Sequence, residues 1–225
     1  IHLGHTLLAQ AALDDAGIDR VVFIPCRKNP LKTWAPKASD EDRLVMIELA
    51  IADMDKVEVS RIELDRIEPS FSWLTVEEFC REEPEAQLFW ILGTDQWDAI
   101  EKWARPEFLA ERLTFLVFPR GDDVRPKDGF RHQELKHAHP ASSTAIRESL
   151  AAGKDFLHPD VLNYIDRQDF AAFNDAITAV IHPRTIAHAF IAFTPGVPLG
   201  GLRLGVGEDA DVVVKAEEGP APHPK

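Results

Sequence analysis

The amino-acid sequence predicts an α/β protein with a Rossmann-like, doubly wound parallel sheet. Two short runs, at residues 21–25 and 88–92, are apolar throughout, which is typical of strands buried on both faces. Amphipathic helical patterns alternate with such runs along the chain, as expected when strands are joined by helices. Polar residues also gather directly after the apolar runs, where open α/β sheets bind their ligands.

The first elements are a helix and a strand. Residues 6–16 are predicted to form an amphipathic helix that ends at Gly17, a residue suited to the left-handed C-terminal position. Its inward positions are expected to be Leu7, Leu8, Ala11 and Ala12. The strand at residues 21–25 follows. Because a doubly wound unit starts with a strand, we expect a first strand ahead of His2 that the printed sequence lacks.

A basic loop and a capped helix come next. Four cationic side chains mark the loop: Arg27, Lys28, Lys32 and Lys37. They stand out in an acidic chain, and either a ligand site or a solvated surface loop explains them. Ser39 is expected to begin the following helix, with Asp42 in the capping-box position. The inward positions of this helix are predicted to be Leu44, Val45, Ile47, Leu49, Ala50 and Ile51.

The same signals predict the remaining elements. Strands are expected at residues 57–60, with an extension over 62–67, and at 88–92, 113–118 and 134–138. Helices are expected at 76–81, 98–104, from Pro106, from Pro140 and at 159–165. Beyond residue 167 we expect a helix at 170–181, a helix or strand at 186–193 and an edge strand at 211–215. The chain thus divides into a main domain (1–167), a C-terminal extension (168–215) and a disordered tail (216–225).

Composition excludes several classes of protein. A formal charge of -13 argues against a nucleic-acid-binding surface, which needs a basic stripe. Cys26 and Cys80 lack the spacing of a zinc site or a disulfide framework, and they favour a reducing cytoplasm. No apolar run approaches the ~18 residues of a membrane-spanning helix, and no signal peptide is recognisable. Nothing in the sequence fixes the oligomeric state, and a homo-oligomer is compatible with it.

Three stretches have the residues of a phosphate site. His2-Leu3-Gly4-His5 places two imidazoles three positions apart at a helix start, where backbone N–H groups attract anions. Gly93-Thr94-Asp95 follows a predicted buried strand, a position that favours function. Ser142-Ser143-Thr144-Ala145-Ile146-Arg147 supplies hydroxyl groups and a cation at another helix start. Taken singly, surface histidines and an ordinary N-cap would explain the first and the last of these stretches.

Together, these stretches resemble bacterial nicotinate-nucleotide adenylyltransferases of the nucleotidylyltransferase superfamily. The family's HxGH motif is matched by His2 to His5, its SSTxIR motif by Ser142 to Arg147, and its GxD…W segment by Gly93 to Asp95 with Trp103. Ser70 to Thr75 is similar to its SYTxDTL stretch, and Arg43, Met46 and Leu49-Ala50 match its RxxMxxLA helix. The glycine-rich lead-in is absent apart from its last histidine, and the PHK motif is Pro30-Leu31-Lys32 here. The resemblance covers about residues 1–167.

The resemblance implies transfer of the adenylyl group of ATP to nicotinate mononucleotide, giving deamido-NAD and pyrophosphate. The acceptor phosphate is already a nucleophile, so alignment and charge stabilisation suffice, and a catalytic base is unnecessary. By the resemblance, the catalytic residues are His2, His5, Lys32 and Arg147. The ATP-binding residues are His2, Gly4, His5, Asp95, Ser142, Ser143, Thr144 and Arg147. Mg²⁺ is expected to bind through the ATP phosphates, without a metal site on the protein itself.

The acceptor is expected to contact Thr94, Trp103 and Lys32, with Thr94 hydrogen-bonding and Trp103 stacking on the nicotinate ring. A half-buried packing role for Trp103 is the alternative. Three alternative functions stay open: a phosphopantetheine adenylyltransferase, which Asn29-Pro30-Leu31-Lys32 also resembles, a nicotinamide-mononucleotide adenylyltransferase, and a non-catalytic nucleotide-binding or scaffold protein.

Overall fold

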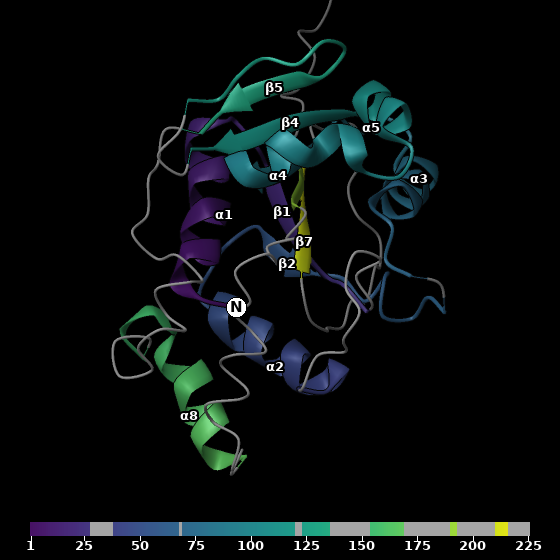
Figure 1. Ribbon diagram of the computed structural model, residues 1–225. Coiled ribbons are helices and arrows are strands. Elements are labelled where there is room, and N and C mark those ends of the chain that lie inside the picture. Colours follow the sequence, from purple (N-terminus) through teal and green to yellow (C-terminus); the bar gives the residue numbers. More distant parts are fainter. Residues whose placement is uncertain are drawn as a thin grey trace, which may run out of the picture.

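A computed structural model describes residues 1–27, 38–67, 69–119, 123–135, 154–168, 190–192 and 210–215, the last two ranges by their backbone. Helices lie on both sides of one sheet (Figure 1). The predicted α/β class is confirmed. Among the described residues, no helix combines the length and apolar character that crossing a membrane requires.

Most strands of the sheet run parallel. β3 (Leu88–Gly93), β4 (Leu113–Phe118) and β5 (Arg131–Glu134) pair in parallel in that order. β2 (Val57–Val59) lies along β1 (Arg20–Pro25) through hydrogen bonds from Val21 N to Lys56 O and from Ser60 N to Phe23 O, both 2.8 Å. These bonds advance in the same direction on both strands, so β2 is parallel to β1.

An antiparallel strand fills the centre of the sheet. β7 (Ala210–Lys215) pairs antiparallel with β1 on one side and with β3 on the other. β6 (Phe190–Ala192) pairs antiparallel with β1 and parallel with β7. The prediction of an edge strand at 211–215 is therefore wrong. Three consecutive valines at 212–214 give this segment a high β-propensity, which suits a central position as well as an edge.

The helices begin and end at recognisable signals. They are α1 (Leu3–Asp15), α2 (Asp40–Ile51), α3 (Ser72–Glu82), α4 (Thr94–Ala99), α5 (Pro106–Arg112) and α8 (Pro159–Arg167), with 3-10 turns at Ile100–Lys102 and Lys154–Phe156. The predicted capping box of α2 is confirmed, since Asp42 N donates to Ser39 Oγ over 3.1 Å. Gly17 follows α1 with φ +65°, the left-handed conformation expected just beyond a helix end.

Side chains alternate between two apolar layers along each central strand. Val21 and Phe23 of β1 face the layer formed with α1 and α2, whereas Val22 and Ile24 face the layer formed with α3, α4 and α5. β3 and β4 alternate in the same way, as strands buried on both faces do. The sheet is therefore wound on both faces, with α1 and α2 on one and α3 to α5 on the other.

Several local expectations differ from the structure. Leu7 is 47% exposed, at the margin of the buried face of α1. Residues 62–67 form a turn and no strand, because Leu64 N and Asp65 N both donate to Arg61 O. The helix expected at 98–104 begins already at Thr94, directly where β3 ends. β5 starts at Arg131 and not at residue 134, in register with Thr114 of β4.

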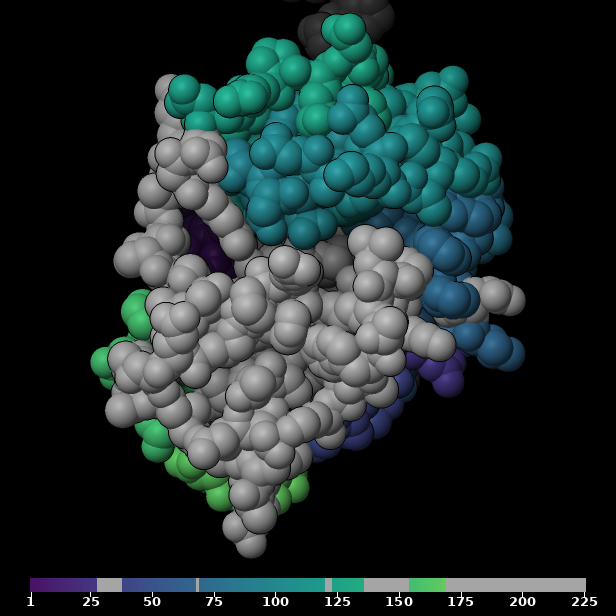
Figure 2. Space-filling model, viewed as in Figure 1, coloured from purple at the N-terminus to yellow at the C-terminus, as the bar shows by residue number. Residues whose placement is uncertain are grey.

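Helix α8 extends the main body beyond the sheet. It packs on α2 at the lower end of the view in Figure 1, where Leu157, Val161 and Ile165 meet Met46 and Ala50. The Tyr164 hydroxyl donates to Asp42 Oδ1 over 2.9 Å, so α8 is also joined to the start of α2. In Figure 2 the described surface of α3 to β5 lies on the opposite side of the molecule from α8.

Candidate functional site

The chain topology brings the predicted motifs to one edge of the sheet. α1 is joined to β1 by a turn of four residues, so the two elements run antiparallel and the start of α1 lies beside the end of β1. Gly93 ends β3, which is parallel to β4. His2 and His5 therefore share the carboxyl edge of the sheet with Gly93, Thr94 and Asp95, as the sequence predicts.

This edge includes the point where the winding of the sheet reverses. Helices associated with β1 cover one face, and helices associated with β3 cover the other. The crevice outside the strand ends at such a reversal is where open α/β sheets bind ligands. The two histidines on one side and the Gly93 turn on the other therefore border the expected ligand position.

His2 and His5 form the N-terminal cap of α1. Both side chains are buried, and their rings stack with centroids 3.7 Å apart and an interplanar angle of 28°. Nδ1 of His2 accepts a hydrogen bond from Gly4 N over 3.1 Å, and Nδ1 of His5 accepts one from His2 N over 3.1 Å. Imidazoles thus take the places that Ser and Glu fill in an ordinary capping box.

These two contacts fix the proton positions on the rings. A backbone N–H group only donates, so each Nδ1 is an acceptor and carries no proton. In a neutral imidazole the remaining proton then lies on Nε2. The start of α1 therefore holds two Nε2–H donors, which are suited to the developing negative charge of a phosphoryl group.

The turn after β3 contributes a buried hydroxyl and an exposed carboxylate. Gly93 is the N-cap of α4, Thr94 is its first residue and is buried, and Asp95 is exposed. Trp103 is half-buried and packs edge-on against the core residue Trp90, with centroids 5.9 Å apart. This contact fits the packing role for Trp103, while the exposed part of the ring remains available for stacking.

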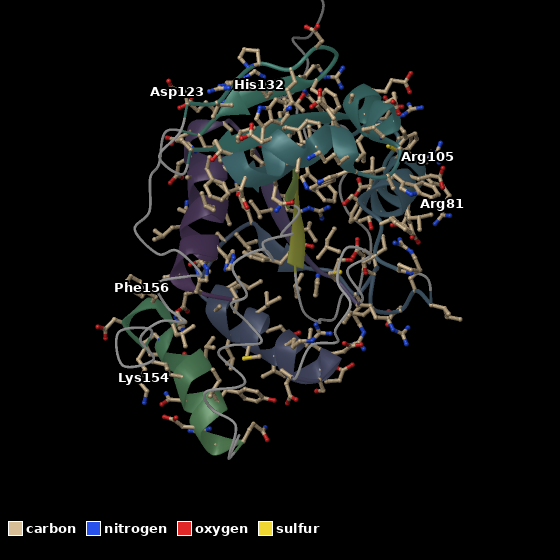
Figure 3. The ribbon with its side chains drawn as sticks, in the orientation of Figure 1. Arg81, Arg105, Asp123, His132, Lys154 and Phe156 are labelled. Carbon is tan, nitrogen blue, oxygen red and sulfur yellow. The ribbon has the colours of Figure 1, made fainter. Side chains whose placement is uncertain are left out.

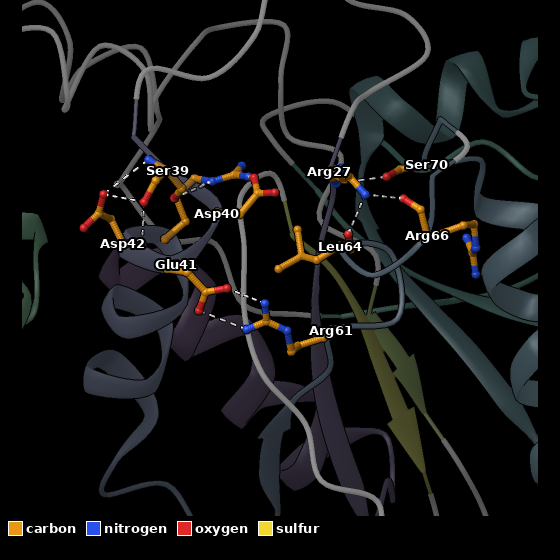
Figure 4. Close-up of polar contacts among 10 residues, drawn as sticks. Arg27, Ser39, Asp40, Glu41, Asp42, Arg61, Leu64, Arg66 and Ser70 are labelled. Atoms are coloured by element: carbon orange, nitrogen blue, oxygen red, sulfur yellow. Dashed lines mark hydrogen bonds and ion pairs between the residues drawn. The ribbon is translucent and has the colours of Figure 1, made fainter.

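The end of β1 is tied to the loop that precedes α3. Arg27 N donates to Ser70 Oγ over 3.0 Å, and Arg27 Nη1 donates to the carbonyl groups of Leu64 and Arg66 over 3.1 and 2.9 Å (Figure 4). Arg27 was one of the four cations of the predicted basic loop. Its guanidinium holds the loop that precedes α3 against the end of β1.

Sequence reasoning missed the buried carboxyl group of Glu63. Its side chain is fully buried and accepts a hydrogen bond from Thr75 Oγ1. Burial raises the pKa of Glu63, although hydrogen bonds from Thr75 and Ser70 and the charge of Arg66 act in the opposite direction. The alternating pattern of residues 62–67 suggested a strand extension, which concealed a polar residue pointing inward.

This raised pKa predicts a pH-dependent stability. Above about pH 4 the unfolded chain ionises Glu63, whereas the folded chain keeps the proton until its own, raised pKa is reached, so stability falls as pH rises through that interval. Glu63→Gln removes this dependence. The melting temperature of the wild type minus that of Glu63→Gln should therefore fall from pH 4.5 to 7.5 in thermal melts followed by circular dichroism. A difference that stays constant would contradict the raised pKa.

The other predicted site residues lie outside the described residues. These are Lys32, Ser142, Ser143, Thr144 and Arg147. Among the residues that the structure describes, no group of three His, Cys, Asp or Glu side chains is placed to hold a metal ion.

His132 has a packing role. It lies on β5, far from Lys154 and Phe156 near α8 (Figure 3), and the centroid of its ring is 5.1 Å from that of Trp97.

Comparison with known proteins gives a consistent result. Residues 1–149 match the family model described as "Cytidylyltransferase-like". A relative from Methylacidiphilum infernorum named "Probable nicotinate-nucleotide adenylyltransferase" is 34% identical over 166 residues, covering 70% of this chain and 78% of its own. A relative of the same name from Bacteroides fragilis is 35% identical over 181 residues, covering 75% and 87%. The fold is also similar to Plasmodium falciparum nicotinic acid mononucleotide adenylyltransferase complexed with NaAD, with a TM-score of 0.64, 17% identity and coverage of 77% and 92%.

Proposed function

Because this chain belongs to the nicotinate-nucleotide adenylyltransferases of the cytidylyltransferase-like family, we propose that it joins nicotinate mononucleotide to the adenylyl group of ATP. A phosphate oxygen of the mononucleotide forms a bond to the α-phosphorus of ATP. The bond from that phosphorus to the bridging oxygen of the β-phosphate breaks, and pyrophosphate leaves. The products are deamido-NAD and pyrophosphate.

The stacked pair of His2 and His5 carries this proposal. Two Nε2–H donors at a buried helix start can hydrogen-bond the α-phosphate as negative charge builds on its oxygens. Both rings are held by backbone N–H groups, so they keep their orientation during an in-line displacement. Such a reaction needs no proton transfer to the protein, which agrees with two rings whose Nδ1 atoms are already occupied.

The remaining residues are assigned by the resemblance of their motifs. Lys32 and Arg147 hold the triphosphate, while Ser142, Ser143 and Thr144 donate hydrogen bonds to its oxygens. Gly4 permits close approach at the start of α1. Asp95, exposed beside the end of β3, bonds a ribose hydroxyl or orients the nucleotide.

The nicotinate ring is assigned to the turn after β3. Thr94 is buried at the carboxyl edge and offers a hydroxyl, and the exposed part of Trp103 offers a stacking surface. By the resemblance, Lys32 supplies a cation to the acceptor. Trp90 packs edge-on against Trp103 and fixes the orientation of its ring. In this proposal Trp103 therefore combines a packing role with contact to the acceptor.

Mg²⁺ is the divalent cation that we propose for the reaction. Mg²⁺ typically binds substrate phosphates and keeps several waters, so a dedicated cage of protein ligands is not required. Asp95 is a carboxylate at the carboxyl edge that fits an outer contact to such an ion. When bound, the ion neutralises phosphate charge and orients the oxygens.

We further propose that residues 1–167 form the catalytic domain and that the protein works in a reducing cytoplasm. Cys26 and Cys80 are both free thiols, which suits that compartment. The role of residues 168–225 in catalysis is open to a direct test by truncation.

An acceptor panel tests the function. The chain is incubated with ATP, Mg²⁺ and nicotinate mononucleotide, nicotinamide mononucleotide or phosphopantetheine, and pyrophosphate release is measured. We expect the fastest release with nicotinate mononucleotide. Release with phosphopantetheine alone would refute the proposal, and ATP binding without release in any mixture would favour a non-catalytic nucleotide-binding protein.

A further inference from the structure

A buried polar network joins three segments beneath the start of α3. Glu63 lies in the turn after β2, Ser70 precedes α3, and Thr75 is in its first turn. All three residues are buried. The carboxyl group of Glu63 receives a hydrogen bond from the hydroxyl of Thr75, and Ser70 is among the groups that act against the raised pKa of Glu63. No phosphate or ATP contact is assigned to any of these residues.

The direction of each hydrogen bond follows from its donors. Arg66 Nη1 donates to Thr75 Oγ1 over 3.2 Å, so the hydroxyl proton of Thr75 is directed to Glu63. Arg27 N donates to Ser70 Oγ over 3.0 Å, which ties the segment before α3 to the end of β1. The chain of donors from Arg66 through Thr75 ends at Glu63. A side chain without acceptor oxygens at this position would remove the acceptor of the Thr75 hydroxyl proton.

The network determines where α3 begins. Ser70 ties the segment to the end of β1, and Thr75 ties the first turn of α3 to the same carboxyl group. The N-cap of α3 is Phe71, and its side chain makes no capping hydrogen bond. The helix start is instead held by the hydrogen bond between Thr75 and Glu63, whereas α1, α2 and α8 begin with a side-chain cap.

The start of α3 lies on the acceptor half of the proposed site. Trp73, at the second position of α3, packs into the same apolar layer as Trp90 and Trp103. The two histidines of α1 adjoin the opposite layer. Because α3 leads into parallel strand β3, its N-terminus lies at the carboxyl edge of the sheet, beside the turn that contains Thr94.

We propose that Glu63 is a positioning residue that holds the Ser70 to Ser72 turn in place as a wall of the nicotinate-mononucleotide site. The inference rests on the proposed function. Glu63 is fully buried, so it acts through Thr75 in the first turn of α3. Loss of the carboxyl group displaces the turn and weakens binding of the acceptor, while the ATP half of the site keeps its geometry.

The test separates the KM values for the two substrates. Glu63→Ala and Thr75→Val should raise KM for nicotinate mononucleotide by about tenfold and leave KM for ATP within about twofold, because small displacements at a site have large effects. Thr75→Ser keeps a hydroxyl that can accept from Arg66 and donate to Glu63, so its KM values should stay close to those of the wild type.

Glu83→Gln is the matched control. Glu83 lies at the other end of α3 with its side chain 9% exposed, and Arg20 Nη2 contacts its Oε1 over 3.4 Å. This substitution should lower the melting temperature without changing either KM.

The possible results are distinct. A KM for the acceptor that is unchanged in Thr75→Val, or changed equally in Thr75→Ser or Glu83→Gln, would overturn the positioning role. If Glu63→Ala does not fold, the comparison of Thr75→Val with Thr75→Ser decides, again by the KM for nicotinate mononucleotide. A wild-type chain that uses ATP with phosphopantetheine only, or with no acceptor, would overturn the proposed function and this inference together.

Discussion

His5→Ala is expected to lower turnover by about 100-fold or more, as the loss of a transition-state hydrogen-bond donor usually does. His5 is buried at the third position of α1, its Nδ1 accepts from His2 N, and its Nε2–H is the group that we propose for the α-phosphate. The substitution also removes the ring that stacks on His2. Both changes affect the transition state more than the binding of ATP.

The measurement is the rate of pyrophosphate release at saturating ATP and nicotinate mononucleotide. His158→Ala is a suitable control, because His158 caps α8 with Nδ1 accepting from Asp160 N over 3.3 Å, much as His2 caps α1. It should reduce stability slightly and leave turnover unchanged. A wild-type rate in His5→Ala would remove His5 from catalysis.

Trp97→Ala is expected to have the largest effect on stability, about 3–5 kcal/mol in the free energy of unfolding. The indole of Trp97 is fully buried in α4 and packs against Phe115 and Phe130, with centroids 5.6 and 6.1 Å away. Its Nε1 also donates to Arg125 O over 2.8 Å. The alanine variant leaves a cavity and an unpaired carbonyl group.

Urea unfolding followed by circular dichroism measures this loss, and Trp97→Phe should recover part of it by refilling the cavity without the hydrogen bond. Ile67→Ala is the control, since Ile67 is 92% exposed and its truncation should change stability by no more than about 0.5 kcal/mol. Equal losses in Trp97→Ala and Ile67→Ala would show that the α4 layer is not part of the cooperative core.

Local signals predicted much of the fold. The apolar runs at β1, β3 and β4 identify strands because both faces of each are buried, so periodicity and burial agree. Ser39 and Gly17 mark helix ends because capping chemistry is decided by neighbouring residues alone. The central place of β7 was not predictable in this way, since its pairing with β1 and β3 joins segments from opposite ends of the chain.

In the candidate site, too, local motifs predicted some residues and missed another. The sequence identified His2, His5, Thr94 and Asp95 by motif, and the topology places all of them at the carboxyl edge of the sheet. Glu63 was missed because a single acidic residue in an alternating segment gives no local sign of burial. Its burial and its hydrogen bond with Thr75 depend on segments that only the folded chain brings together.

The imidazole cap of α1 also has an energetic consequence. The rings of His2 and His5 are immobilised when the helix forms, because each Nδ1 is bound to a backbone N–H of the same turn. The rotational entropy of these two side chains is therefore lost during folding, before any nucleotide binds. If the two rings bind the triphosphate as proposed, it meets donors that need no further ordering, so less of its binding energy is consumed and more can lower the barrier.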